Sequence, residues 1–417
     1  MNKPLRILGF SASLLACGAF GFFVSDLQMG KGPSIEALAR LGGARSSSAK
    51  LSGEGVFREN YALILADYEK PIKPIDLRYA GIGGMMASLG DPYTVFFPPR
   101  ASAAFNEETR ANFFGIGARL GADSLGAKVS EVFDDSPAFR AGLRKGMIIT
   151  SVDGKTVVGT EIDKIVGVIK GPEDTIVRLG VVKPGVAKPV TLTVKRGKIV
   201  APTVTSVVVP NTHIGLLTVN TFSEPTTIQF DQGLRKLEAG KIRGLVIDMR
   251  GNPGGLLTVA ADMVGRFVED KPVVTMHFRN GSQEVQRSPS GQRHGFRYPV
   301  AVLVDGDSAS AAEIFAGNMK DYGKATLVGT RTFGKSSVQN VFPLVDNSSA
   351  KVTIAKYYLP STGYIGRKLD EDGVMLSGGL EPDVKVELRQ DKPVTIGDPA
   401  TDNQLAKAIE ILKAKSR

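Results

Sequence analysis

The strongest constraint on the fold is an alternation of apolar strand-like runs with amphipathic stretches, which continues from about residue 197 onward. The runs "HIGLLTVNTF" and "IRGLVIDM" are followed by "TTIQFDQGLRKLEAG" and "LLTVAADMVGRFVE", which have helical periodicity. Repeated strand–helix–strand units build a mostly parallel sheet covered by helices. The sequence therefore predicts an α/β layered domain over residues 197–390, followed by a C-terminal helix assigned to residues 391–417.

Two further regions precede this domain. Residues 56–109 begin with helical periodicity and reach the proline-containing "GDPYTVFFPPR", which predicts an N-terminal helical segment. Residues 110–196 alternate short β-type runs with turns and one or two helices, and "SVDGKTV" is a hairpin signal. The size and pattern favour a small β-rich module, so the whole chain is expected to be of the mixed α/β class.

The amino terminus predicts export. Residues 1–30 contain Lys3 and Arg6 and then an uncharged apolar run from Ile7 to Val24, which is typical of a signal peptide or a membrane anchor. "LLAC" also resembles a lipoprotein signal with Cys17 as the lipidated residue; the alternative is a small apolar residue inside a signal helix. Anchor, lipoprotein and cleaved signal are left open. The pattern predicts membrane association through the N-terminus, export, and a folded part in the periplasm or on the outer face of the bacterial inner membrane.

The segment after this run, residues 31–55, is small, polar and glycine-rich and is interpreted as a linker. The chain carries 52 basic and 42 acidic residues, for a net charge of +10. The charges are scattered, which favours a solvated surface near an anionic membrane over a nucleic-acid partner. With one cysteine and three widely separated histidines, neither a disulfide, a metal site nor a cofactor is expected.

"GTRTFGKSS", residues 329–337, matches the phosphate-loop pattern G-x-x-x-x-G-K-[ST]. A phosphate loop needs a strand before it and a long helix after it. The following "SSVQNVFPLVD" has three valines and a proline at Pro343, which disfavour that helix. A nucleotide site is therefore the weaker reading, and Lys335 needs another partner.

A serine lies at the expected start of a helix in "VAVLVDGDSASAAEIFAG". At such a helix N-terminus, N–H groups and the helix dipole favour a developing oxyanion near Ser310. The alternative is structural, because Ser310 and Glu313 form an S-x-x-E capping box. "DMRGNPGG" repeats the strand–turn–helix pattern, and its glycines either bring backbone N–H groups to a ligand or only make a tight turn. Asp248 and Arg250 are expected to pair as a clamp at the strand end.

A nucleophilic serine needs a base. No histidine has a persuasive context, and "GDSAS" is not a G-x-S-x-G elbow. Burial lowers the pKa of a lysine, and Lys335 has Phe333 and Val338 as apolar neighbours. Gln339 orients the amine only if the chain makes a helical turn, since a straight strand separates the two by about 13 Å. A surface lysine and a solvated amide are the alternatives.

In combination, these motifs resemble the carboxy-terminal processing, or tail-specific, proteases. In that family a serine in S-A-S-A precedes a lysine by 25 residues and a glutamine by four more, the spacing of Ser310, Lys335 and Gln339. "DMRGNPGG", "SLGDPYTVFF" and the stretch from "FFGIGA" to "VKRG" match the family's glycine turn, N-terminal cap segment and inserted PDZ domain. The resemblance covers roughly residues 55–417 and implies a crotonase-like α/β protease core with a PDZ domain at 110–196. Ser336 departs from it where the family often has glycine.

The resemblance implies a serine endopeptidase acting in proteolysis, in which Ser310 is the nucleophile, Lys335 accepts its proton and Gln339 holds the amine. Backbone N–H groups of Gly254 or Gly255 and of Ala311 are expected to stabilise the oxyanion. The alternatives are a non-catalytic PDZ peptide-binding scaffold, in which Ser310 is only a cap, and a nucleotide-binding protein.

The PDZ resemblance also implies a partner. The resemblance implies that the "GIGA" loop captures a terminal carboxylate; the loop consists of Gly115, Ile116, Gly117 and Ala118. The alternative interpretation of this loop is an ordinary β-turn. Ile116 and Leu120, with residues 165–169, are expected to line a pocket for an apolar last side chain, and Lys170 either meets the peptide or is solvated. The expected partners are protein or peptide substrates with apolar C-termini, and not nucleic acid. The oligomeric state is left open, a homo-oligomer included.

Overall fold

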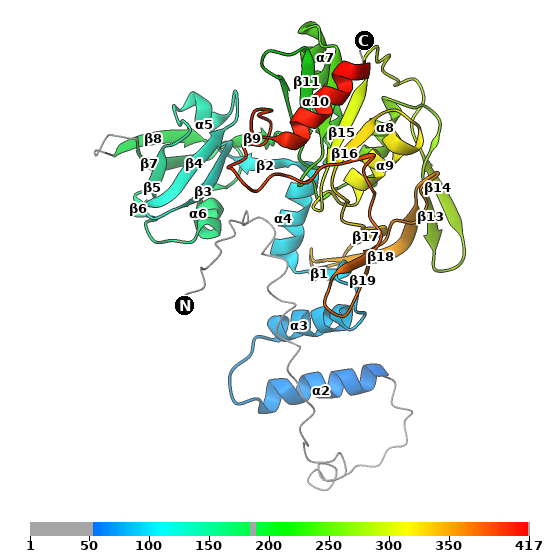
Figure 1. Ribbon diagram of the computed structural model, residues 1–417. Coiled ribbons are helices and arrows are strands. Elements are labelled where there is room, and N and C mark those ends of the chain that lie inside the picture. Colours follow the sequence, from blue (N-terminus) through cyan, green and yellow to red (C-terminus); the bar gives the residue numbers. More distant parts are fainter. Residues whose placement is uncertain (1–52, 184–188, 416–417) are drawn as a thin grey trace, which may run out of the picture. The chain divides into compact units, whose positions relative to one another are not determined.

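A computed structural model of the 417-residue chain describes residues 53–183 and 189–415 (Figure 1). The signal peptide or anchor predicted for residues 1–30, Cys17 and most of the expected linker lie outside the described residues. Among the helices that are described, none has both the length and the apolar character needed to cross a membrane. The chain divides into two compact units, Met1–Pro98 and Pro99–Arg417, which are treated separately below.

The described part of the first unit contains two helices and a short strand, α2 (Gly53–Asp67), α3 (Pro74–Ala87) and β1 (Val95–Phe97). Pro74 occupies the first turn of α3, where a missing N–H costs no hydrogen bond. Neither helix has a buried residue. The helical segment predicted from residue 56 is confirmed, although α2 begins at Gly53, inside the expected linker.

The second unit begins with a β-rich module. Its elements are α4 (Pro99–Arg110), β2 (Asn112–Gly115), β3 (Ala118–Asp123), β4 (Gly126–Val132), α5 (Pro137–Arg140), β5 (Ile148–Val152), β6 (Lys155–Thr156), α6 (Ile162–Ile169), β7 (Ile176–Val182), β8 (Val190–Lys195) and β9 (Gly197–Val200). One sheet has the order β3-β4-β5-β7-β8, and β2 pairs with β9 separately. The predicted hairpin is confirmed, because β6 pairs with β5 through Val152 and Lys155. The module has its own apolar core, to which Ile165 and Ile169 of α6 contribute.

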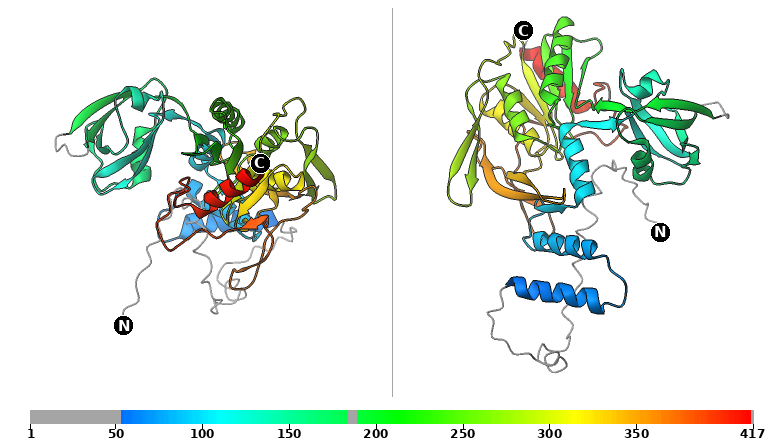
Figure 2. Two further views of the ribbon diagram at one scale, coloured as in Figure 1. Left: turned by 45° about the horizontal axis from the view of Figure 1, so that its top comes forward. Right: turned by 180° about the vertical axis from the view of Figure 1, so that it is seen from behind.

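The remaining elements form the α/β domain (Figure 2). They are β10 (Val204–Val208), β11 (Ile214–Val219), α7 (Thr226–Ala239), β12 (Gly244–Asp248), α8 (Leu257–Gly265), β13 (Pro272–Phe278), β14 (Gln283–Arg287), β15 (Val300–Val304), α9 (Ala311–Asp321), β16 (Thr326–Gly329), β17 (Ser337–Pro343), β18 (Ser349–Tyr358), β19 (Lys368–Leu369), β20 (Met375–Ser377), β21 (Val384–Lys385) and α10 (Asn403–Lys415). The central sheet has the order β10-β11-β12-β15-β16-β21. All of its pairs are parallel except β10–β11, which confirms the mostly parallel core.

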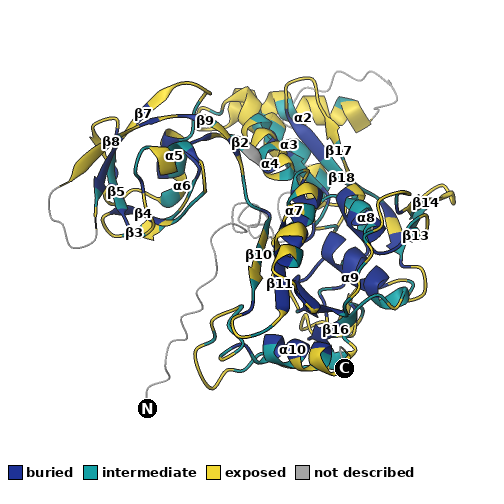
Figure 3. Ribbon diagram, turned by 90° about the horizontal axis from the view of Figure 1, so that it is seen from above, coloured by how far each residue is buried: buried dark blue, intermediate teal, exposed yellow. Residues whose placement is uncertain are grey.

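The central strands β12 and β15 are buried at every position. Both faces of the sheet are covered, and Figure 3 shows buried residues between α7 and α10. Helices α7, α8 and α9 pack on one face, and α10 packs on the other through Leu405, Ala408, Ile409 and Leu412. Such burial explains the unbroken apolar runs of the strands, because a parallel strand has no solvated side.

Two expectations for this domain need correction. The strand-like "VKVELR" forms only the two-residue β21, and α10 begins at Asn403 rather than at residue 391. The two strands that follow Lys335, β17 and β18, belong to a second sheet, in which β18 pairs with β17 and β13, and β13 also pairs with β14. The segment after the lysine is therefore a strand, which removes the helix that a phosphate loop requires.

Candidate active site

Ser310 immediately precedes α9, after the buried strand β15 and a short loop. Its backbone has φ 55° and ψ −117°. An ordinary N-cap residue has extended φ and ψ, and a non-glycine residue at positive φ costs about 1–3 kcal/mol. The side chain is half-buried. The conformation therefore differs from that of a simple cap, and strain of this kind clusters at functional sites.

Glu313, on the first turn of α9, is the centre of a buried hydrogen-bond network. Its Oε2 accepts the N–H groups of Ser310 at 2.8 Å and Lys335 at 2.9 Å. Its Oε1 accepts the Gly334 N–H and the Thr332 hydroxyl, each at 2.6 Å. The side chain is fully buried, and burial raises the pKa of the carboxyl although the four hydrogen bonds act to lower it. The predicted capping glutamate thus reaches the lysine loop as well as the helix start.

Lys335 lies in the loop between β16 and β17 and is half-buried. Because it shares an acceptor with Ser310, the two backbone nitrogens are at most 5.7 Å apart, the sum of 2.8 and 2.9 Å. The Tyr357 hydroxyl gives a second link, since it donates to the carbonyl oxygens of Lys335 at 2.5 Å and Ser310 at 3.5 Å. The fold therefore brings together the two residues that the spacing pattern singled out.

The residues around the lysine have definite partners. Ser336, where the family often has glycine, is buried and donates its hydroxyl to the Tyr357 carbonyl oxygen at 2.6 Å. Phe333, expected as an apolar neighbour of the amine, carries the Arg367 guanidinium 3.8 Å above its ring centroid. Val338 packs against the main core. The loop is thus fixed on several sides.

Gln339 lies on strand β17 and not on a helical turn, so the condition under which it was expected to reach the amine from a helix is not met. Its Nε2 donates to the hydroxyls of Ser337 at 2.9 Å and Thr353 at 3.1 Å. The ladder between β17 and β18 shifts register between Val338 and Gln339. These contacts fix the amide in the sheet beside the lysine loop.

The glycine turn after β12 lies against Ser310. Gly254 has φ 99°, and a Cβ on it would lie 2.7 Å from the Ala309 carbonyl oxygen and from the Ser310 Cβ. Its N–H donates to Asn252 Oδ1 at 2.9 Å, so this N–H is engaged inside the turn. The N–H groups of Gly255 and Ala311 make no hydrogen bond within the described part of the chain. Of the three N–H groups expected to bind an oxyanion, these two have the capacity to do so.

The clamp predicted between Asp248 and Arg250 is confirmed, because Arg250 Nε and Nη2 donate to the two Asp248 carboxylate oxygens at 2.9 and 2.7 Å. Sequence reasoning did not identify Asn252, Tyr357 or Asp402, which also bond to this turn or to the lysine loop. Asn252 is part of the quoted turn motif, so its pairing with Gly254 two residues later was the one available signal. Tyr357 and Asp402 are distant in sequence and carried none.

The "GIGA" loop joins β2 to β3. Ile116 is buried in the same core as Ile165 and Ile169, and Leu120 packs against this core; that these side chains line a pocket for a peptide stays a prediction. Gly117 has φ 78°, and a Cβ there would lie 2.4 Å from the Ser136 Cβ. Lys170 is partly exposed, and its Nζ pairs with Glu107 at 2.7 Å and lies 4.9 Å from the Phe113 ring centroid, so the two expected alternatives, a peptide contact and a solvated lysine, stay open.

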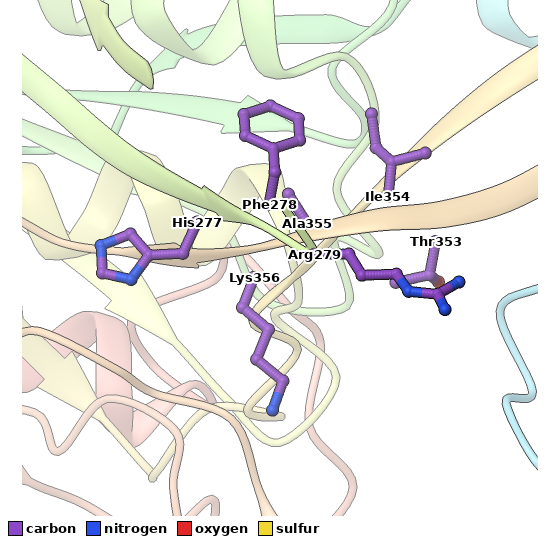
Figure 4. Close-up of a pocket in the computed structure, with 7 residues that line it drawn as sticks. All are labelled: His277, Phe278, Arg279, Thr353, Ile354, Ala355 and Lys356. Carbon is purple, nitrogen blue, oxygen red and sulfur yellow. The ribbon is translucent and has the colours of Figure 1, made fainter. Parts of the chain in front are cut away.

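A shallow hollow of about 370 Å³ adjoins the strand that carries Gln339 (Figure 4). It is lined mainly by apolar atoms of His277, Phe278, Arg279, Thr353, Ile354, Ala355 and Lys356. Thr353 connects this hollow to the site, because its hydroxyl oxygen accepts a hydrogen bond from Gln339 Nε2.

Comparison with known proteins places this geometry in context. The model of peptidase family S41 matches residues 213–386, and a PDZ domain model matches residues 128–183. The carboxy-terminal processing protease CtpB of Bacillus subtilis (strain 168) is 32% identical over 390 residues, which cover 93% of this chain and 78% of CtpB. CtpA of the same organism is 31% identical over 382 residues, with 89% and 78% covered.

The fold has a solved counterpart, a Bacteroides fragilis protein assigned to the S41 proteases. It superposes with a TM-score of 0.50 at 17% identity, over 84% of this chain and 92% of that one. The predicted mixed α/β fold with a PDZ domain is confirmed by these similarities.

Proposed function

The chain belongs to the carboxy-terminal processing proteases of peptidase family S41, serine-type peptidases with a PDZ domain, and from this premise we propose that Ser310 and Lys335 form its catalytic dyad. Ser310 Oγ attacks the carbonyl carbon of a peptide bond, and the neutral Lys335 amine accepts the hydroxyl proton. The lysine then gives this proton to the departing amine, which leaves an acyl-enzyme. Water releases the acyl group by the same sequence of proton transfers.

The oxyanion of each tetrahedral intermediate binds the N–H groups of Gly255 and Ala311. These groups come from two segments that meet at Ser310, and the N–H of Ala311 also lies at the positive end of α9. One such donor typically contributes about 2.7–4 kcal/mol to transition-state stabilisation. Gly254 has a different part in this scheme, because its lack of a Cβ lets the turn approach the nucleophile.

The observation that carries the proposal is the shared Glu313 oxygen. A simple helix cap would bond only the helix start, whereas Glu313 also binds the backbone of Lys335. Gln339 assists in this scheme by holding the lysine amine through its amide oxygen, since its Nε2 is engaged by the hydroxyls of Ser337 and Thr353.

The PDZ domain selects substrates in this proposal. Its "GIGA" loop binds the terminal carboxylate of a protein, and apolar C-termini are preferred. The folded protein acts outside the cytoplasm, in the periplasm or on the outer face of the inner membrane. This placement rests on the charged and apolar pattern of residues 1–30.

The test is cleavage of an unfolded protein, with and without an apolar tail, by the wild type, Ser310→Ala and Lys335→Ala. The proposal expects cleavage only by the wild type, with the tailed substrate cut faster, and unchanged circular dichroism of both variants. Wild-type turnover by Lys335→Ala would refute the base assignment. Tail binding by all three proteins without any cleavage would instead establish a peptide-binding scaffold.

A further inference from the structure

A buried ion cluster joins the glycine turn to the start of the C-terminal helix. The Arg250 guanidinium binds Asp248 through Nε and Nη2, and it binds Asp402 through Nη1 at 3.0 Å and Nη2 at 2.7 Å. Gln404 Oε1 accepts a further bond from Nη1 at 2.9 Å. The Arg250 and Asp402 side chains are 6% and 0% exposed, so this arginine is enclosed by partners from two segments 152 residues apart.

The turn that follows Arg250 is held at successive points. The Gly251 N–H donates to the Asp305 carboxylate at 3.0 Å, and the Asn252 carbonyl oxygen accepts the Ala309 N–H at 2.9 Å. At the far end, the Phe222 N–H donates to the Gly254 carbonyl oxygen, also at 2.9 Å. The turn thus contacts the residue directly before Ser310, and Arg250 is its connection to α10.

We propose that Asp402 is a positioning residue for peptide cleavage, which fixes Arg250 and thereby the turn that aims the Gly255 N–H at the reacting carbonyl. The inference rests on the proposed function of this site. Asp402 acts through Arg250 and touches neither the substrate nor Ser310. Gln404 supports the same arginine from the first turn of α10.

α10 is also held by apolar packing, so an effect of Asp402 on the turn can be distinguished from an effect on folding. Four apolar side chains of α10 are buried against the central sheet, and they remain when Asp402 is changed. Asp402 also caps the helix, because its Oδ1 accepts the Leu405 N–H at 3.0 Å. Asparagine is an equally good cap of similar shape, so Asp402→Asn keeps the cap and removes the negative charge that faces Arg250, together with the carboxylate oxygen that accepts the Gly397 N–H at 3.1 Å.

A matched control exists in the same domain. Arg266 also binds an aspartate at two points: its Nε and Nη2 donate to Asp231 at 3.1 and 2.8 Å, in a pair that joins α7 to the end of α8 away from the turn. Asp231→Asn therefore removes an aspartate from an arginine without touching the site.

The experiment compares the full-length wild type, Asp402→Asn and Asp231→Asn in two measurements. The first is kcat and KM on an unfolded protein with an apolar tail. We expect Asp402→Asn to lower kcat at least tenfold with KM within twofold, and Asp231→Asn to leave both within twofold. The second is hydrogen exchange by mass spectrometry. We expect Asp402→Asn to accelerate exchange at least tenfold in the peptide containing residues 249–256 and to leave the central strands of the sheet unchanged.

The outcomes are separable. Unchanged kcat with unchanged exchange in residues 249–256 overturns the inference. Faster exchange throughout the domain, with kcat falling in parallel with melting temperature, also overturns it, because Asp402 is then merely structural. If the wild type itself cleaves nothing, the proposed function fails, and the exchange measurement alone decides whether Asp402 holds the turn.

Discussion

Ser310 and Lys335 donate their backbone N–H groups to the same oxygen atom, Oε2 of Glu313. The start of α9 and the β16–β17 loop are therefore both fixed to one buried acid, in addition to the direct bond from the Phe333 N–H to the Ser308 carbonyl oxygen at 3.1 Å. A displacement of that carboxylate would alter the position of the nucleophile and of its base together.

Replacing Glu313 by glutamine should lower kcat more than tenfold. An amide offers one acceptor oxygen where the carboxylate accepts four hydrogen bonds, so at least one N–H of the site loses its partner. Each buried donor left unpaired costs about 1–3 kcal/mol of unfolding free energy. Urea unfolding and steady-state kinetics measure both effects. Glu238→Gln is the control, since that carboxylate binds His294 and Tyr298 elsewhere, and it should leave kcat within twofold.

The wild type and Glu313→Gln should also differ in how their stability depends on pH. Burial raises the pKa of Glu313 in the folded protein above its ordinary value of 4.5. The folded state then binds this proton more tightly than the unfolded state, so the contribution of Glu313 to stability is fully present below 4.5 and is lost as pH rises through the folded pKa. The free energy of unfolding of the wild type minus that of Glu313→Gln should therefore fall from acidic to neutral pH. A rise would mean that the four hydrogen bonds outweigh burial.

Gly254→Ala should abolish cleavage, whereas Gly251→Ala should not. Both glycines have positive φ, 99° and 67°, so both substitutions cost conformational energy of about 1–2 kcal/mol. Only at Gly254 would the added Cβ meet Ser310, while nothing lies within 4 Å of one at Gly251. Because of this contact the Gly254 variant should also melt at a lower temperature, and a loss of kcat at temperatures where it remains folded would support close approach of the turn to the nucleophile. Equal activities would contradict it.

Tyr357→Phe should reduce kcat with little change in packing, because the ring is buried and only the hydroxyl is removed. The lost donor served the Lys335 and Ser310 carbonyl oxygens, and the expected loss of unfolding free energy is about 1–3 kcal/mol. Tyr322→Phe removes a similar bond, to the Pro272 carbonyl oxygen at 2.7 Å, far along α9 from the site. It should lower stability without lowering kcat. Thermal unfolding and peptide cleavage by both variants provide the comparison.

A peptide with a free C-terminal carboxylate should bind the inactive Ser310→Ala protein at least tenfold more tightly than its amidated form. The expected reason is that backbone N–H groups of the "GIGA" loop lose their anionic partner on amidation. Fluorescence anisotropy with labelled peptides ending in an apolar residue measures the ratio. Equal affinities would remove the carboxylate from the recognition scheme.

Much of the fold follows from patterns that are local in the sequence. The buried strands β12 and β15 appear as unbroken apolar runs, and α7 and α9 appear through helical periodicity. The extent of the last elements was less predictable. "VKVELR" has alternating character throughout, but within it only Val384 and Lys385 have register partners on β16, and pairing decides where a strand ends.

The site divides in the same way. Ser310 and Lys335 were identified through their spacing, and Glu313 through its position three residues after the serine. That Glu313 also binds the lysine loop, and that Arg250 is shared with Asp402, depends on contacts across 22 and 152 residues. No local pattern encodes such contacts. The N–H of Gly254 was expected to face the substrate. It instead donates to the Asn252 side chain, and the sequence of the turn does not reveal which backbone N–H that side chain will accept.

The distance in sequence between Arg250 and Asp402 has a consequence for biosynthesis. A ribosome makes the glycine turn, the serine and the lysine long before it makes the aspartate that steadies the arginine. A growing polypeptide would thus contain every reacting group while still lacking the contact that aligns them. The full rate of peptide-bond hydrolysis would therefore be reached only after that late segment had docked.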